Sequence, residues 1–165
     1  MNVKAEPKAK QETKTNLQTK LEEIVAADND FDIDEFISGA RIAFEYILNA
    51  YATGDANELK PLLSDEVFNN FNVSIREREM AGQTMEETLI GISKAELIEA
   101  EMEGTVVQLT VKFISDQIHA LKDSDGNVVE GDPDKIVSIT DFWTFTRDTR
   151  SKDPNWLLSA THSLD

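Results

Sequence analysis

The sequence predicts an α+β fold in which helices come first and an antiparallel sheet follows. Up to about residue 80, apolar residues recur at helical spacing, as in Phe36, Ala40 and Phe44. From about Ser93 onward the apolar period changes to two, which is typical of strands with one buried face. A run of helices followed by a run of strands favours an α+β architecture over alternating units.

Three helices are predicted in the first half of the chain. The longest covers residues 34–53 and ends at Gly54, a helix-terminating signal. The next is short, because Pro61 lacks a backbone donor and should end or kink it. Ser64 is the predicted N-cap of the third helix, which should end before Gly82.

Four strands are predicted near residues 93–103, 105–120, 135–148 and 155–163. The last two form a hairpin with two tryptophans. Alternate residues of a strand share a face, so Asp141, Trp143 and Phe145 should point the same way, and Trp156 should continue that face after the turn. Such an apolar face needs a large cover, and the long helix is the predicted cover.

Composition indicates one domain with an N-terminal tail. The 165 residues include no cysteine, which excludes disulfides and thiolate metal sites. Residues 1–28 hold five lysines and five acidic residues, so the net charge of −16 lies on residues 29–165. This surface repels phosphate backbones, and no nucleic acid is expected as a partner. The acidity either only keeps the protein soluble or attracts a basic peptide or protein.

The tail, residues 1–28, is predicted to be flexible, and the folded domain to span residues 29–165. Residues 1–16 have the polar composition of disordered or marginally helical segments. A short amphipathic segment follows, and no apolar run is long enough to span a bilayer. The predicted contacts to a membrane or a protein partner are Leu17, Leu21, Ile24 and Val25.

An apolar pocket is predicted between the long helix and the sheet. A helix packed on a curved sheet can leave a cavity at one end, which is a common ligand site. The large side chains expected to line it are Phe44, Leu48, Tyr51, Phe68, Phe71, Phe113, Trp143 and Trp156. The alternative is that these side chains fill the core completely.

The sequence gives little support for catalysis. Asp141 lies on an apolar face, where a carboxylate can act as a general base, but a hydrogen-bonded structural role is favoured. His119 and His162 lie near predicted strand ends, and a dyad would require one of them to approach Asp141 or Asp116. The sequence contains no metal-binding, nucleophile, phosphate-loop or dinucleotide motif, so no catalytic residue, metal or cofactor is predicted.

Three motifs resemble those of a known family. Residues 140–147 read Thr-Asp-x-Trp-Thr-Phe-x-Arg, and residues 153–160 read Asp-Pro-Asn-Trp-x-Leu-x-Ala. Residues 54–68 read Gly-Asp-x-x-x-Leu-x-Pro-Leu-Leu-Ser-Asp-Glu-Val-Phe. These patterns are similar to those of the C-terminal domain of the mitochondrial inner-membrane translocase subunit 44 and of the bacterial TimA-type adaptor proteins. The resemblance covers about residues 30–165.

The resemblance implies a nuclear-transport-factor-2-like cone with an apolar pocket and no enzymatic activity. It also implies a membrane-associated adaptor related to protein translocation, which binds a protein partner, such as a chaperone or membrane protein, or a lipid or peptide tail. The expected location is a bacterial inner membrane, reached peripherally or through an anchor missing from this chain, because no mitochondrial presequence is seen. One alternative is a small cone-fold enzyme of the ketosteroid-isomerase or dehydratase type. Another is a structural module with a filled cavity.

Overall fold

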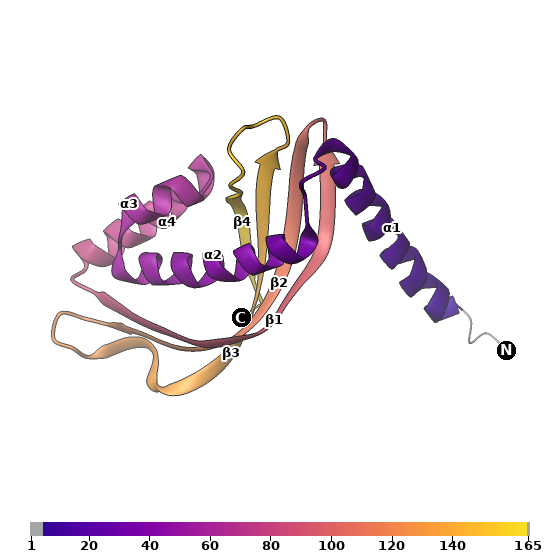
Figure 1. Cartoon of the computed structure of the whole chain (residues 1–165). Helices are drawn as coiled ribbons and strands as arrows, with labels where there is room; N and C mark the ends of the chain where they lie inside the picture. The colour runs from indigo at the N-terminus through magenta and orange to yellow at the C-terminus, as the bar shows by residue number, and fades with distance from the viewer. Residues whose placement is uncertain (1–4, 165) are drawn as a thin grey trace.

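The computed structural model describes residues 5–164, and the side chains of residues 16–164. In this part of the chain, helices precede a four-stranded antiparallel sheet of order β1-β2-β3-β4, so the predicted α+β class is confirmed (Figure 1). The elements are α1 (Ala5–Ala27), α2 (Ile33–Thr53), α3 (Ala56–Leu59), the 3-10 helix η1 (Lys60–Leu62), α4 (Asp65–Met80), β1 (Thr84–Glu103), β2 (Val106–Lys122), β3 (Val128–Asp148) and β4 (Leu157–Ser163).

Helix α2 lies against the concave face of the bent sheet (Figure 1). The Asp32 side chain caps its N-terminus by accepting hydrogen bonds from the backbone N–H groups of Asp34 and Glu35, at 2.8 and 3.1 Å. Gly54 ends the helix with a φ of 76°, a left-handed conformation that favours glycine. The buried stripe of α2 consists of Phe36, Ala40, Phe44, Ile47 and Ala50.

Between α2 and β1, the short helix ends and α4 begins at the residues predicted from the sequence. Pro61 lies in η1, where the short helix ends, and the Ser64 hydroxyl accepts a hydrogen bond from the Val67 N–H at 3.3 Å to cap α4. The same residue joins this segment to the sheet, because the Ser64 N–H donates to the carbonyl of Leu158 in β4 at 2.9 Å.

Two strands are longer than the sequence pattern indicates. β1 begins at Thr84 rather than near residue 93, and β3 begins at Val128 rather than near residue 135. Register shifts between β1 and β2 occur at Leu89/Gly91, Ile92/Lys94 and Leu97/Glu99. Residues 84–90 do alternate between exposed and half-buried, but the inward residue Glu87 is polar, so an apolar period of two is not visible at the start of β1. The register shifts interrupt the alternation further along the strand.

The core lies between α2 and the concave face of the sheet. Phe44 stacks on Phe113 with ring centroids 4.4 Å apart and contacts Trp143 at 4.6 Å. Phe44 and Phe113 are 0% exposed and Trp143 is 4% exposed. The predicted cover of the hairpin by the long helix is therefore confirmed for Trp143. Trp156 lies just before β4 and is also covered by α2, because it packs on Phe36 with ring centroids 4.9 Å apart.

Helix α1 begins at Ala5, well before the amphipathic segment expected from Leu17. Its C-terminal part contacts β1, while its N-terminal part leads away from the rest of the domain (Figure 1). Ile24 is 1% exposed and belongs to the core, and Leu17 and Leu21 pack against it. Among the described residues, no helix combines the length and apolar character that a membrane span requires.

Gly131 provides a test of the β2–β3 pairing. Its φ is 77°, and a Cβ at this position would overlap the carbonyl oxygen of His119 on β2. We expect Gly131→Ala to lower the free energy of unfolding by about 1–3 kcal/mol in urea denaturation. Gly126→Ala is the matched control, because Gly126 has a φ of 84° but nothing within 4 Å of its Cβ position. Equal losses in the two variants would show that the contact with His119 is unimportant.

Candidate functional site

An open groove of about 930 Å³ lies beside α2 at the edge of the packed core, and Phe36, Ala40 and Phe145 belong to both. We call it the α2 groove. It is bounded by the α1–α2 loop, α2, the α3–η1 segment and the loop between β3 and β4. Its apolar lining consists of Phe31, Phe36, Ala40, Ile42, Ala43, Tyr46, Pro61, Leu62, Phe145, Pro154 and Trp156.

The floor of the α2 groove is a cluster of aromatic rings from distant parts of the chain. Trp156 contacts Phe36 at 4.9 Å and Phe31 at 6.1 Å between centroids, both edge-on. Phe36 also meets Phe145 of β3 edge-on at 5.8 Å. Rings held in this way form a rigid apolar surface, which suits a binding site better than flexible side chains do.

Two apolar side chains stand on the lip of the groove and are open to solvent. Ile42 is 70% exposed and Tyr46 is 43% exposed, although both belong to α2. Helix α2 therefore shows apolar residues on a second side, outside its buried stripe. Exposed apolar side chains next to an apolar floor are typical of a surface that binds a partner.

The rim of the groove is acidic. Its charged lining consists of Asp28, Asp30, Asp32, Glu35, Glu58, Arg147 and Lys152, so acids outnumber bases by five to two. The Arg147 charge is already engaged, because its Nη1 lies 2.9 Å from Oδ2 of Asp28. The remaining carboxylates produce a negative potential around an apolar floor.

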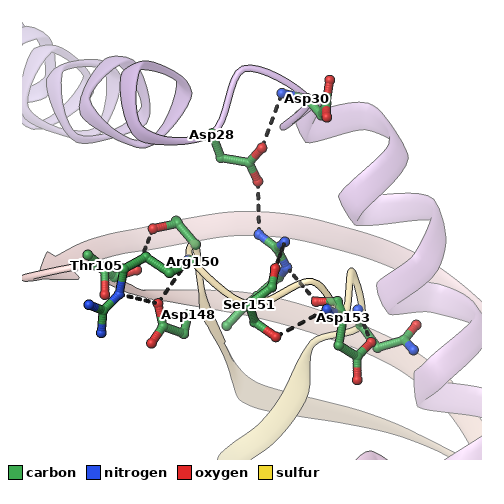
Figure 2. A network of polar contacts seen from close by, with 10 residues as sticks. Asp28, Asp30, Thr105, Asp148, Arg150, Ser151 and Asp153 are labelled. Carbon is green, nitrogen blue, oxygen red and sulfur yellow. Dashed lines mark hydrogen bonds and ion pairs between the residues drawn. The ribbon is translucent and has the colours of Figure 1, made fainter.

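Arg147, near the end of β3, joins the α1–α2 loop to the β3–β4 loop at one end of the α2 groove. Besides the ion pair with Asp28, its Nε donates to the carbonyl of Asp153 at 3.2 Å and its Nη2 to that of Ser151 at 3.3 Å. Figure 2 shows Asp28, from the α1–α2 loop, facing the β3–β4 loop that carries Ser151 and Asp153. The Asp28 and Arg147 side chains are 21% and 12% exposed, so solvent screens the pair only in part.

The β3–β4 loop is also held from its other side (Figure 2). The Thr149 N–H and hydroxyl both donate to the carbonyl of Thr105 at 2.8 Å. Asp148 accepts a hydrogen bond from the Arg150 N–H at 3.0 Å. This backbone hydrogen bond, helped by Thr105, holds the pKa of Asp148 below its ordinary value. The loop that forms one wall of the groove is therefore anchored at several points.

The predicted pocket residues divide between core and groove. Phe44, Phe113 and Trp143 are fully packed against one another, and Trp156 lines the α2 groove. The others, Leu48, Tyr51, Phe68 and Phe71, are half-buried and pack on the core. Phe31, Phe36 and Arg147 also line the groove and were not predicted as site residues from the sequence, although Arg147 stands in one of the family-like motifs.

The predicted membrane or partner contacts divide into side chains that pack on the domain and one that is exposed. Ile24 is buried in the domain, and Leu17 and Leu21 are half-buried against it. Val25 is 43% exposed. In this conformation three of the four side chains therefore contact the domain itself, because the apolar stripe of α1 faces β1.

The histidines do not line the groove. His119 Nδ1 lies 2.7 Å from Oε2 of Glu87, a residue for which the sequence predicted no role. His162 is exposed and lies near Phe142, with ring centroids 6.2 Å apart. Within residues 16–164, no group of three acidic or histidine side chains is arranged as metal ligands.

A long helix on the concave face of an open, strongly bent antiparallel sheet defines a cone of the nuclear-transport-factor-2-like type. Residues 17–163 match the model of the Tim44-like domain, and the chain belongs to this family. The predicted resemblance is thereby confirmed.

Similar proteins include the mitochondrial import inner membrane translocase subunit TIM44 of Rattus norvegicus, 27% identical over 143 residues, which are 86% of this chain and 32% of the relative. TIM44-1 of Arabidopsis thaliana is 26% identical, over 78% of this chain and 27% of the relative. The human TIM44 subunit is 24% identical, over 86% of this chain and 32% of the relative. The chain thus spans about a third of the length of these relatives.

Among solved structures, the intermembrane space region of the chloroplast protein ARC6 superposes with a TM-score of 0.52. The match covers 81% of this chain and 97% of the ARC6 region, at 14% sequence identity. At this level of identity the likeness concerns the fold alone.

Proposed function

We propose that this domain is a non-enzymatic adaptor at a membrane, related to protein-translocation machinery, and that the α2 groove binds its protein partner. The observation that carries the proposal is an open apolar groove with an acidic rim. Family membership supports a role at a membrane in protein translocation, since the relatives are named as subunits of an inner-membrane translocase.

The chemistry of the groove favours a basic amphipathic segment of a protein as the occupant. Such a segment places apolar side chains on the floor formed by Phe36 and Trp156, and basic side chains near Glu35 and Glu58. Opposite charges on the two surfaces raise the association rate and select against acidic segments. An anionic lipid headgroup would meet the same carboxylates unfavourably, so a protein segment fits better than a lipid.

We further propose that the adaptor works at the surface of a bacterial inner membrane. The resemblance of the motifs to bacterial TimA-type adaptors supports the bacterial setting, and the relatives named above, which are subunits of a mitochondrial inner-membrane translocase, support an inner membrane only. Cell fractionation of the full-length gene product tests the location. Recovery in the membrane fraction, and release from it by alkaline carbonate, would support peripheral attachment, whereas recovery only in the soluble fraction would contradict it.

The groove is tested by titrating the domain with a fluorescent basic amphipathic helical peptide. Ile42→Lys is expected to weaken binding about tenfold, because it removes an apolar contact and adds a repelling charge, together worth about 1.4 kcal/mol. Ile42 is 70% exposed, so the fold should tolerate the change. Val73→Lys is the matched control, since Val73 is an exposed aliphatic residue of α4 outside the groove.

A peptide of the same composition in scrambled order, which lacks an apolar face, should bind more weakly than the amphipathic one. Equal affinities for the two peptides would contradict the proposed mode of binding. Equal effects of Ile42→Lys and Val73→Lys would contradict the assignment to the α2 groove.

A further inference from the structure

Glu87 is a buried carboxylate on the concave face of the sheet, outside the α2 groove. Its side chain is 8% exposed, and its Oε2 lies 2.7 Å from Nδ1 of His119. The other oxygen, Oε1, is closed to solvent and has no hydrogen-bond partner among the described residues. A buried acceptor without a partner destabilises the folded state, and more so when it is charged.

The charged groups around Glu87 come from three elements. His119 lies directly opposite on β2, and Asp141 of β3 is close enough to interact electrostatically. From α4, Arg78 reaches the same strand, with Nη1 3.5 Å from Sδ of Met85, but its Nη2 donates to the carbonyls of Tyr51 and Ala52. His119 is therefore the group that directly pairs with Glu87.

Burial favours the neutral form of Glu87. Desolvation is the largest cause and raises the pKa of Glu87 above its ordinary value of 4.5. The hydrogen bond and charge of His119 lower the pKa, and the Asp141 carboxylate raises it. Because Oε1 is closed to solvent and has no hydrogen-bond partner among the described residues, nothing in direct contact with this oxygen stabilises a negative charge on it.

The position of Glu87 means that a movement of the strand requires little free energy. The residue lies close to the start of β1, which is an edge strand paired only with β2. A register shift between Leu89 and Gly91 separates the first part of β1 from the rest. Short strand ends at a sheet edge open locally at a small fraction of the free energy of global unfolding.

We propose that the Glu87–His119 pair is a proton-controlled switch that keeps residues 84–89 of β1 on β2 in acidic solution and releases them as the pH rises. With the proton bound, the Glu87 side chain is neutral and its burial is stable. Without it, a buried negative charge lies beside the Asp141 carboxylate, and the contact with His119 offsets the cost of burial only in part. Opening of the strand end exposes the carboxylate to water and relieves this unfavourable state.

The direction of the pH dependence follows from the raised pKa. An acid whose pKa is higher in the folded state than in the open state stabilises the folded state. For Glu87 this stabilisation is fully present at pH values below its ordinary pKa of 4.5. That contribution is lost as the pH rises through the raised value. A single proton is involved, so the opening equilibrium changes by at most about tenfold per pH unit in this window.

Hydrogen–deuterium exchange of the whole chain tests the switch, with rates corrected for the intrinsic effect of pH. Protection of residues 84–89 is expected to fall by up to about tenfold per pH unit above pH 4.5, while residues 97–103 at the other end of β1 serve as the reference. Glu87→Gln should remove the pH dependence. Glu86→Gln should retain it, since the neighbouring Glu86 is half exposed and pairs with Lys122 at 2.7 Å.

Two results would overturn the switch: pH-independent protection of residues 84–89 in the unmodified chain, or an unchanged slope in Glu87→Gln. A direct measurement covers the case in which Glu87→Gln does not fold. Carboxyl carbon shifts of Glu87 in the unmodified protein should titrate above pH 4.5 and in parallel with the loss of protection. Titration at or below that value would also refute the proposal.

Discussion

Replacing Phe44 by alanine is expected to lower the free energy of unfolding by about 3–5 kcal/mol, because the cavity left by the ring cannot collapse. Phe44 is 0% exposed and lies between Phe113 and Trp143, with centroid distances of 4.4 and 4.6 Å. The loss is a large part of the roughly 5–15 kcal/mol that stabilises an ordinary domain. Urea denaturation followed by tryptophan fluorescence measures it, since Trp143 reports on the same core.

Tyr46→Ala is the matched control for this prediction. Tyr46 belongs to the same helix and also carries an aromatic ring, but it is 43% exposed. Its removal should change the free energy of unfolding by less than about 1 kcal/mol. If Phe44→Ala lowered the free energy of unfolding no more than Tyr46→Ala, Phe44 would face open space, as the pocket predicted from the sequence would require.

Replacing Arg147 by alanine is expected to lower the free energy of unfolding by about 2–4 kcal/mol, since the side chain serves three acceptors with little exposure. The change leaves the Asp28 carboxylate unpaired and removes the donor to the carbonyls of Ser151 and Asp153. Chemical denaturation gives the magnitude. A double-mutant cycle with Asp28→Asn isolates the coupling between the two loops.

Arg147→Ala should also weaken peptide binding, because the two loops that form one end of the α2 groove lose their connection. Arg150→Ala is the control: Arg150 lies in the β3–β4 loop just after Arg147, its side chain is 76% exposed, and its Nε is 3.7 Å from Oδ1 of Asp148. Its effect on stability should stay within about 0.5 kcal/mol. If the two arginine variants behaved alike, the role of Arg147 in joining the loops would be refuted.

Local signals in the sequence predicted helices α2, α3 and α4 well, but not the length of α1. Ser64 and Gly54 act on neighbouring residues through capping and backbone conformation, so their meaning does not depend on the rest of the fold. The start of β1 was less predictable, because one of its inward residues, Glu87, is polar, so the apolar alternation on which a strand prediction depends is absent there.

The candidate site was only partly predictable. Trp156 was expected at a pocket and does line the α2 groove, whereas Phe44 and Phe113 belong to the core. All three are large apolar residues in amphipathic patterns, and the pattern alone does not distinguish a ring that fills space from one that borders it. That distinction depends on how α2 sits over the bent sheet.

The sequence by itself determined the α+β class, the caps of α2 and α4, the inward orientation of Trp143 and the family, since these depend on local hydrogen bonding, periodicity and motifs. Only the tertiary structure decided that a filled core and an open groove lie beside the same helix. It also decided which charged groups meet. Asp28 and Arg147 are 119 residues apart, and Glu87 and His119 are 32 apart. Such contacts depend on strand register and on the bend of the sheet, which arise from the packing of the whole chain.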